Sequence, residues 1–167
     1  MITLTGHEND LIYGGYGDDV ITLTGDHNDF IYGGSGDDVI TLTGNSSAAI
    51  YGRNGDDVIT LTGDDNFGIN GDYGADRITI TGDSNDYIRG QSGDDTIIIY
   101  GDDNDEIYGG NGRDSCSIVS SDGVSTVDSC ESAAPGYSPA PTGSAAPTAS
   151  PTAAPTAAPT EAPTLSP

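Results

Sequence analysis

Residues 14–32 read GGYGDDVITLTGDHNDFIY, and relatives of this 19-residue template follow one another along the chain without an insertion. The glycine that opens each copy recurs at constant spacing: Gly14, Gly33, Gly52, Gly71, Gly90 and Gly109. A partial copy, MITLTGHENDLIY, precedes them at residues 1–13. A fixed period of this kind is typical of repeat architectures, in which each unit is stabilised by packing on its neighbours.

Apolar and hydroxyl residues alternate within each copy, as in Ile21-Thr22-Leu23-Thr24. This period of two predicts a strand with isoleucine and leucine buried and threonine facing outward. Each copy has room for a strand of about five residues, a strand of about three and two turns, but not for a helix. The sequence therefore predicts an all-β solenoid in which 19-residue coils stack as parallel strands.

The chain is strongly acidic, with 27 Asp and Glu residues against four Lys and Arg and a formal net charge of −23. Nucleic acid and anionic membrane surfaces would be repelled, so neither is an expected partner. Membrane insertion is not expected either, because no stretch approaches the roughly 20 consecutive apolar residues of a spanning helix.

Stacking places the acids of each GGxGDD turn about 4.8 Å from those of the next coil. Columns of carboxylates at this spacing repel one another, and the four arginines are too few to neutralise them. A bound metal ion is the simplest remaining counter-charge. Oxygen donors, without a thiolate or imidazole cluster, favour calcium over zinc or copper.

The segments GGYGDDVIT (residues 14–22) and GGSGDDVIT (residues 33–41) match the pattern GGxGxDxUx at every specified position. The chain thereby resembles the RTX, or haemolysin-type, calcium-binding repeat proteins. The resemblance implies a right-handed parallel β-roll over residues 1–114, with Ca²⁺ held between the turns of adjacent coils by aspartate carboxylates and turn carbonyls. The implied metal ligands of this first row are Asp19, Asp38, Asp57, Asp76, Asp95 and Asp114, with Gly14, Gly17, Gly33, Gly36, Gly52 and Gly55.

The other half of each copy departs from the motif, because it lacks glycine at the fourth position. It retains the final aspartate in four copies, which predicts a weaker second row of ligands: Asp10, Asp29, Asp86 and Asp105. Ala48 and Phe67 interrupt that row. In the first row, the second glycine of the motif is replaced in three copies by Arg53, Asp72 and Gln91.

A cap and a tail are expected after the repeats. Similarity to secreted proteins of this repeat class implies a cap over residues 115–132, closed by a disulfide between Cys116 and Cys130, with two buried thiols as the alternative. Residues 133–167 contain all nine prolines and predict a disordered Pro/Thr/Ala-rich stalk. Together with the glycosylation sequon Asn45-Ser46-Ser47, they favour an extracellular location, secreted or on the cell surface.

Two surface arrays leave alternatives open. TxT pairs in successive copies are similar to the ice-binding face of some β-solenoid antifreeze proteins: Thr3 and Thr5, Thr22 and Thr24, Thr41 and Thr43, Thr60 and Thr62, Thr79 and Thr81. The strand propensity of threonine is the competing explanation. A second array, Tyr13, Tyr32, Tyr51 and Tyr108, either stacks as a ladder or offers rings to a glycan.

No HExxH or GxSxG motif occurs, so the chain itself is not expected to be an enzyme. Met1 aligns with the column of Val20, which suggests a start inside a coil and leaves a third alternative: the repeat module of a larger secreted enzyme. Such an uncapped edge also predicts edge-to-edge self-association. The favoured prediction is a structural or adhesive module that folds on binding calcium, with a glycan, a cell wall or ice as its surface partner.

Overall fold

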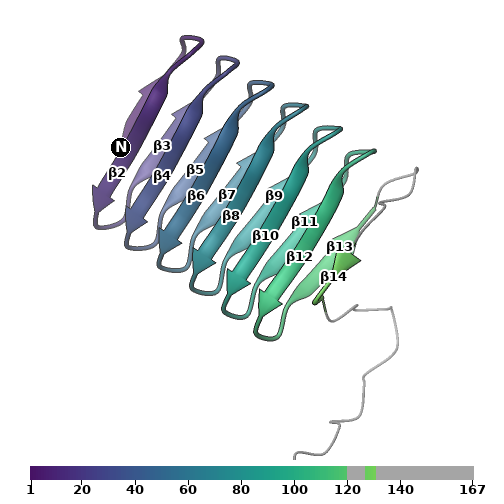
Figure 1. Ribbon diagram of the computed structural model, residues 1–167. Helices are drawn as coiled ribbons and strands as arrows, with labels where there is room; N and C mark the ends of the chain where they lie inside the picture. Colours follow the sequence, from purple (N-terminus) through teal and green to yellow (C-terminus); the bar gives the residue numbers. More distant parts are fainter. Residues whose placement is uncertain (120–126, 131–167) are drawn as a thin grey trace, which may run out of the picture. The chain divides into compact units, whose positions relative to one another are not determined.

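The computed structural model describes residues 1–119 and 127–130. Each coil contains one short and one long strand, joined by two turns (Figure 1). The short strands are β1 (Ile2–Leu4), β3 (Val20–Leu23), β5 (Val39–Leu42), β7 (Val58–Leu61), β9 (Arg77–Ile80), β11 (Thr96–Ile99) and β13 (Ser115–Ile118). The long strands are β2 (Asp10–Tyr16), β4 (Asp29–Ser35), β6 (Ala48–Asn54), β8 (Phe67–Tyr73), β10 (Asp86–Ser92) and β12 (Asp105–Asn111), followed by the two-residue β14 (Val127–Asp128).

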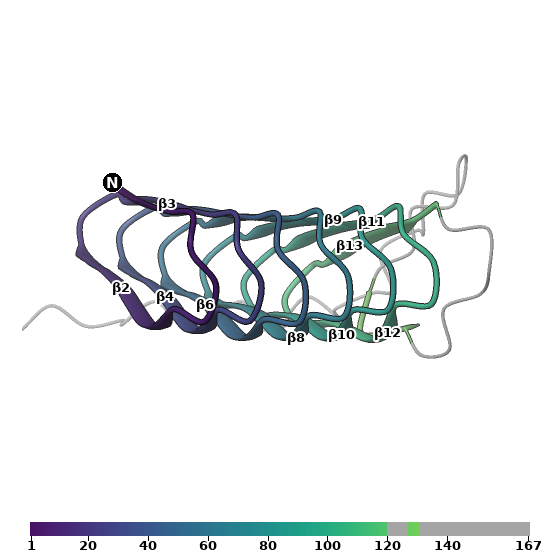
Figure 2. The same cartoon turned by 90° about the horizontal axis from the view of Figure 1, so that it is seen from above.

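The strands form two parallel sheets of seven strands each. Sheet A contains the short strands in the order β1-β3-β5-β7-β9-β11-β13, and sheet B has the order β14-β12-β10-β8-β6-β4-β2. Each residue pairs with its equivalent one coil later, as Ile21 does with Ile40. Figure 2 shows the two sheets facing each other, with the turns joining their edges. The predicted all-β parallel solenoid is therefore confirmed, and no helix occurs in the described residues.

Isoleucine and leucine columns fill the space between the sheets. Ile21 and Leu23 of sheet A and Ile31 of sheet B are completely buried, and their equivalents along the roll repeat this arrangement. Full burial of such a side chain contributes roughly 1.5–3 kcal/mol. Because each of these side chains is covered by the coils before and after it, an isolated coil could not form this core.

The long strands extend further than the sequence analysis expects. The sequence predicts that the second strand of each coil has about three residues. In the structure this strand is longer: β4 has seven residues and includes Gly33 and Gly34. These glycines pair with the adjacent coils instead of turning, as Gly34 does with Gly15. A Cβ added to Gly34 would clash with the carbonyl group of Gly15, so the backbones approach too closely for a larger residue. The turn begins only after this glycine pair.

Both sheets continue past residue 114 into the predicted cap. Strand β13 pairs with β11, which places Cys116 opposite Ile97 at the end of the core column. Cys116 forms a disulfide with Cys130, which confirms the predicted pairing. The rest of the predicted cap (120–126, 131–132) and the stalk at 133–167 lie outside the described residues. Within the described part there is also no helix that is long and apolar enough to cross a membrane.

Candidate calcium site

Two kinds of turn connect the sheets. The first follows each of the long strands β2 to β12 and ends in an aspartate, as in Gly55-Asp56-Asp57; we call it the Asp turn. A second acid precedes this aspartate in four of the six turns, and Ala75 and Arg113 take its place in the other two. The second follows each short strand and ends in a buried polar residue, as in Gly63-Asp64-Asp65-Asn66; we call it the Asn turn. The six predicted aspartate ligands belong to the Asp turns, as do Gly17, Gly36 and Gly55, whereas Gly14, Gly33 and Gly52 lie within the long strands.

The last aspartate of each Asp turn is buried, except in the first coil. Its relative exposure is 1% or less at Asp38, Asp57, Asp76, Asp95 and Asp114. Oδ1 of each accepts a hydrogen bond from the backbone N–H of the equivalent aspartate one coil earlier, at 2.7–2.9 Å. Asp19, in the first coil, is partly exposed, and its Oδ1 lies 3.4 Å from the amino group of Met1.

The second oxygen of these carboxylates has no partner. Oδ2 is buried without a hydrogen bond in Asp38, Asp57, Asp76, Asp95 and Asp114. This oxygen lies against the glycine that opens the motif: a Cβ added to Gly52 would lie within 3.0 Å of Oδ2 of Asp57 and 2.8 Å from the carbonyl oxygen of Gly71. A carboxylate oxygen from one coil and a carbonyl oxygen from the next therefore approach the same point.

The same convergence recurs along the roll. A Cβ on Gly33 would lie 2.8 Å from the carbonyl oxygen of Gly52, and one on Gly90 would lie 2.6 Å from that of Gly109. In both cases Oδ2 of the aspartate in the same motif is also within 3.0 Å. Carboxylate and carbonyl oxygens are the ligands that Ca²⁺ prefers, so the donors present fit this ion.

Burial makes the charged form of these aspartates costly. It raises the pKa of Asp57 to about 7, a shift that the hydrogen bond from Asp38 opposes and the charge of Asp76 increases. Burial likewise raises the pKa of Asp76 to about 7 and that of Asp95 to about 6. If these buried aspartates are charged, a bound cation is needed to balance their charge. Without a cation, they must be protonated.

The Asn turns contain the same ladder in neutral form. Oδ1 of Asn85 accepts a hydrogen bond from the backbone N–H of Asn66 at 2.8 Å, as the aspartates do. The amide Nδ2 of Asn66 donates to the carbonyl oxygen of Gly63 at 3.0 Å, so both ends of this side chain are satisfied. Ser47 takes the place of asparagine in one coil, and Nδ2 of Asn85 is the one amide of the column that is buried without a partner in the described residues.

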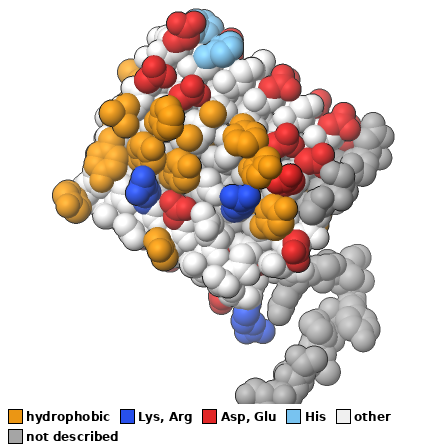
Figure 3. Space-filling model, in the orientation of Figure 1, with side chains coloured by type: hydrophobic (Ala, Val, Ile, Leu, Met, Phe, Trp, Pro, Cys, Tyr) orange, Lys and Arg blue, Asp and Glu red, His pale blue; other side chains and the backbone are white. Residues whose placement is uncertain are grey.

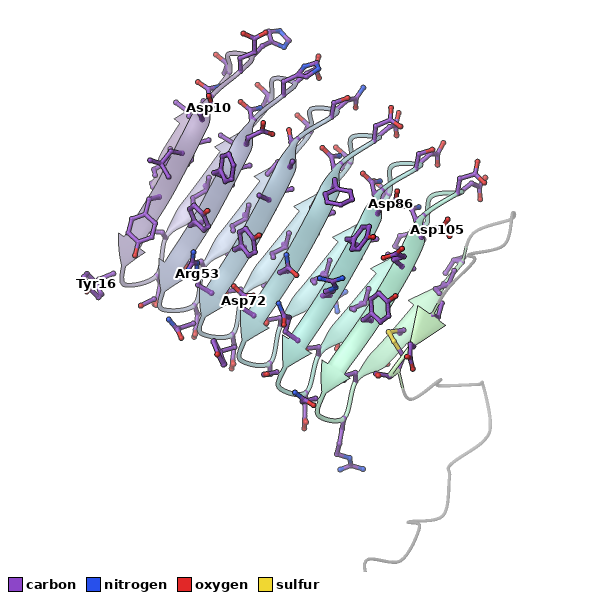
Figure 4. All side chains as sticks on the ribbon, viewed as in Figure 1. Asp10, Tyr16, Arg53, Asp72, Asp86 and Asp105 are labelled. Atoms are coloured by element: carbon purple, nitrogen blue, oxygen red, sulfur yellow. A yellow bond between two sulfur atoms is a disulfide. The ribbon has the colours of Figure 1, made fainter. Side chains whose placement is uncertain are left out.

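This buried asparagine column was not among the predicted features: Asn28, Asn66, Asn85 and Asn104, with the partly buried Asn9 in the first coil. Asparagine is common in polar turns, and only its exact 19-residue recurrence marks it as structural. The predicted second-row aspartates lie one residue later, at the start of the long strands (Figure 4).

The second-row aspartates have a different environment from the first row. Asp29 is partly exposed, and its Oδ1 accepts a hydrogen bond from the backbone N–H of Ala48 at 2.9 Å. Burial raises the pKa of Asp86, and the charge of Asp105 raises it further. Asp10 is exposed. A second row of calcium ligands at these positions stays a prediction.

The first acid of each pair, which we call the outer acid, forms a second ladder of hydrogen bonds between coils. This ladder runs in the opposite direction along the roll. Oδ1 of Asp18 accepts from the backbone N–H of Asp37 one coil later at 3.0 Å, and Oδ1 of Asp37 accepts from that of Asp56 at 2.9 Å. These outer carboxylates are exposed. The two aspartates of one turn therefore hold the coils on either side of it.

The glycine at the fourth motif position is required by the backbone. Gly17, Gly36 and Gly55 have φ values of 89°, 119° and 127°, which favour glycine. Each also donates its N–H across the coil interface, as Gly36 does to the carbonyl oxygen of Asn54 at 2.9 Å. These residues shape the turn in which the buried carboxylates lie.

No group of three or more His, Cys, Asp or Glu side chains in the described residues is arranged to hold a metal ion. A cation at the Asp turns would therefore combine single carboxylates with backbone carbonyls, which is a donor set that suits calcium.

The chain matches the protein family described as RTX calcium-binding nonapeptide repeat (4 copies) over residues 6–28, 23–46, 49–67, 70–98 and 99–116. No curated protein and no solved structure matches it. The matched residues make up more than half of the chain and include all the Asp turns. From this match, and from the parallel roll that carries those turns, it follows that the chain belongs to the RTX calcium-binding nonapeptide repeat family.

Proposed function

We propose that this protein is a structural and adhesive module of the cell surface or extracellular space, and that its roll folds when it binds calcium. Membership of the RTX repeat family supports calcium binding. The observation that carries the coupling to folding is the row of buried Oδ2 atoms without a partner at Asp38, Asp57, Asp76, Asp95 and Asp114.

The coil contact at Asp57 illustrates the mechanism. Oδ2 of Asp57 and the carbonyl oxygen of Gly71 are the donors that would hold the ion there. Bound calcium supplies the positive charge that neighbouring buried carboxylates otherwise lack. Without it, a buried carboxylate pays a desolvation cost of several kcal/mol and is repelled by the aspartates about one strand spacing away.

This coupling suits an extracellular protein. Calcium sites of extracellular modules have dissociation constants on the order of 10⁻⁴–10⁻³ M. A chain with this affinity would remain unfolded at low calcium and fold after export. The Cys116–Cys130 disulfide supports the same location, because disulfides persist mainly in oxidising compartments. The role we propose is not enzymatic, since metal binding accounts for the buried carboxylates.

Far-ultraviolet circular dichroism of the full chain tests the proposal. We expect little β signal in chelator and a cooperative rise on titration with calcium, but not with the same concentrations of magnesium. A complete β spectrum in chelator would show that the buried carboxylates do not need calcium, and would overturn the coupling of binding to folding.

Ice binding is a second candidate, favoured by the register of sheet A. Thr22, Thr41, Thr60 and Thr79 pair directly across adjacent strands, and the next residue in the column is Ile98. Among the outward positions of β3, β5, β7 and β9, Arg77 is the one charged residue. Ice shaping by the folded chain, lost in a Thr41→Lys/Thr60→Lys variant, would support this function. Unchanged ice growth would exclude it.

A further inference from the structure

The outer face of sheet B carries side chains that neither the core nor the Asp turns use. Residues two apart on a strand share a face, so two adjacent columns project here. The first column contains Tyr13, Tyr32, Tyr51, Asn70, Arg89 and Tyr108 in register. The second contains Gly15, Gly34, Arg53, Asp72, Gln91 and Gly110.

Three consecutive coils carry side chains where the other coils have glycine. Arg53, Asp72 and Gln91 have φ values of 89°, 80° and 84°, in the left-handed region that disfavours residues with a Cβ. This conformation costs roughly 1–2 kcal/mol per residue. Left-handed φ values also recur at other non-glycine residues of the coils, such as Phe30 at 56° and Ser46 at 55°, so this row is distinguished by its three polar side chains in a column that is otherwise glycine. The three side chains form one row across adjacent strands, in which Figure 4 labels Arg53 and Asp72.

Hydrogen bonds connect the polar members of the row. Nε2 of Gln91 donates to Oδ1 of Asp72 at 3.0 Å and to Oδ1 of Asn70 at 3.4 Å. The guanidinium of Arg53 lies close enough to Asp72 to lower its pKa, against the larger rise that burial causes. Donors and acceptors therefore alternate along the centre of the face.

Aromatic rings hold both guanidinium groups in place. The guanidinium carbon of Arg53 lies 4.6 Å from the ring centroid of Tyr32 and 5.7 Å from that of Tyr51. The two rings stack at 5.3 Å. Contacts of this type fix the direction of the Arg N–H donors before any ligand arrives.

The second arginine has the same arrangement on the other side of Asp72. The guanidinium carbon of Arg89 lies 5.1 Å from the ring centroid of Tyr87 and 5.4 Å from that of Tyr108. Phe67, half exposed, contacts Tyr87 with ring centroids 4.6 Å apart. In Figure 3, hydrophobic side chains gather on this face with Lys or Arg side chains among them.

The charge of the face limits its ligand. Two of the four basic residues of a chain with net charge −23 lie here, beside Asp72 and beside Glu106, whose side chain is hydrogen-bonded to Tyr87. A polyanion would be repelled by the rest of the chain, and a polycation would meet the two guanidinium groups. A neutral ligand that has both apolar faces and many hydroxyls matches this mixture, because rings bind the apolar faces and the Arg, Asp, Asn and Gln groups bind hydroxyls.

We propose that this surface, which we call the Tyr/Arg face and define by Tyr32, Tyr51, Arg53, Asp72, Arg89 and Gln91, binds a neutral glycan chain. At ~4.8 Å per strand, the distance from β4 to β10 is about 14 Å, which accommodates a short oligosaccharide. The inference rests on the proposed function, because it supplies the surface through which the module would adhere.

The test uses the full chain in calcium, with laminarin, a cello-oligosaccharide and a mannan as neutral probes and alginate as an anionic probe. Binding is measured by isothermal titration calorimetry. The variant Arg53→Gly/Asp72→Gly/Gln91→Gly restores the glycine that three other coils have at this position, so it should fold and respond to calcium as the parent does. We expect at least one neutral probe to bind, and the variant to lose 10-fold or more in affinity.

The control variant Thr60→Ser, on sheet A, should bind as the parent does. The proposal is overturned if no neutral probe binds, if alginate alone binds, or if the glycine variant retains full affinity. Self-association that disappears in the glycine variant, with no glycan binding, would instead make the face an interface between copies. Circular dichroism separates this result from the calcium proposal: glycan binding by a chain folded in chelator would support the Tyr/Arg face and refute calcium-coupled folding.

Discussion

The backbone N–H of Asp38 donates a hydrogen bond to Oδ1 of Asp57 at 2.7 Å, while Oδ2 of Asp57 is buried without a partner. In the Asn turns, the backbone N–H of Asn66 donates a hydrogen bond to Oδ1 of Asn85 in the same manner. The two ladders differ in one atom per residue, because an amide NH₂ replaces a carboxylate oxygen. This difference separates a coil contact that needs a cation from one that does not.

Converting the first ladder into the second should remove the calcium requirement. We expect the variant with asparagine at Asp38, Asp57, Asp76, Asp95 and Asp114 to show the full β spectrum in chelator and no further change with calcium. Each substitution removes a buried unpaired charge and supplies a donor near the glycine carbonyls. The measurement is circular dichroism with and without calcium.

The outer acids provide the matched control for this variant. Asp37→Asn/Asp56→Asn/Asp94→Asn removes charge from the same turns but keeps the Oδ1 acceptors of the outer ladder. This control should still need calcium to fold. A five-asparagine variant that remained unfolded in chelator would refute the role assigned to the buried carboxylates.

Position along the roll should determine the effect of losing one carboxylate. Asp57 is buried in the middle of the stack, whereas Asp19 is partly exposed in the first coil. We expect Asp57→Ala to reduce the steepness of the calcium titration more than Asp19→Ala, because it interrupts contacts on both sides. Equal effects would argue against coupling between neighbouring coils.

The metal-free protein should become more stable as the pH falls from 8 to 5. Burial raises the folded-state pKa of Asp57 and Asp76 to about 7 and that of Asp95 to about 6, from an ordinary value of 3.8. The folded state therefore binds more protons between pH 4 and 7, and its stability is lost as the pH rises through the folded pKa values.

Far-ultraviolet circular dichroism in metal-depleted buffer measures this dependence: the chain should show little β signal at pH 8 and gain β signal at pH 5. With calcium present the direction should reverse, because protons compete with the cation for the same carboxylates. A metal-free β signal that rose with pH would contradict the assignment of these groups as buried and uncompensated.

The glycine that opens the motif should not tolerate a methyl group. In Gly52→Ala the new Cβ would meet Oδ2 of Asp57 within 3.0 Å and the carbonyl oxygen of Gly71 at 2.8 Å. We expect a loss of about 1–3 kcal/mol in the free energy of unfolding and a weaker calcium response, because the methyl group occupies the space between the two donors. In Gly6→Ala, where the nearest atom lies at 3.7 Å, both quantities should stay close to the parent values. Chemical denaturation in calcium measures both variants.

The disulfide should stabilise the last coil. Cys116 and Cys130 are separated by 14 residues, and closing a loop of this size contributes about 3 kcal/mol through the entropy of the unfolded chain. Cys116→Ser/Cys130→Ser should therefore unfold at lower denaturant concentration than the parent. Adding reductant should bring the parent to the midpoint of the variant and leave the variant unchanged; a parent insensitive to reductant would disprove the contribution.

The 19-residue period was sufficient to predict the coil and the core columns and to align the aspartates of the Asp turns, but it did not indicate that these aspartates are buried. Constant spacing aligns Asp57 with Asp76, and the alternation around Ile59 determines which side chains enter the core. The Cys116–Cys130 pairing was also predicted, from the two cysteines at the predicted cap and the similarity to secreted proteins of this repeat class, and the structure has this disulfide. These features depend on the residue pattern within one coil and on the equivalent residues of the adjacent coils.

Other features depend on interactions that the pattern does not encode. Gly33 and Gly34 were interpreted as a turn, but backbone pairing between coils keeps them in a strand. The Asn66 column resembles an ordinary polar loop until its hydrogen bonds are known. Arg53, Asp72 and Gln91 are visible in the sequence as departures from the motif. Their position beside the tyrosine column follows only from the register of the strands in sheet B.

The opposing aspartate ladders restrict how such a gene can evolve. Asp37 receives an N–H from the following coil through Oδ1, while Oδ1 of Asp38 receives one from the preceding coil. Inserting a single residue between two turns would misalign both ladders and move the core residues to the opposite face. Duplication of a complete 19-residue segment leaves every one of these bonds with an equivalent partner. Descendants of this gene should therefore differ in length by whole coils.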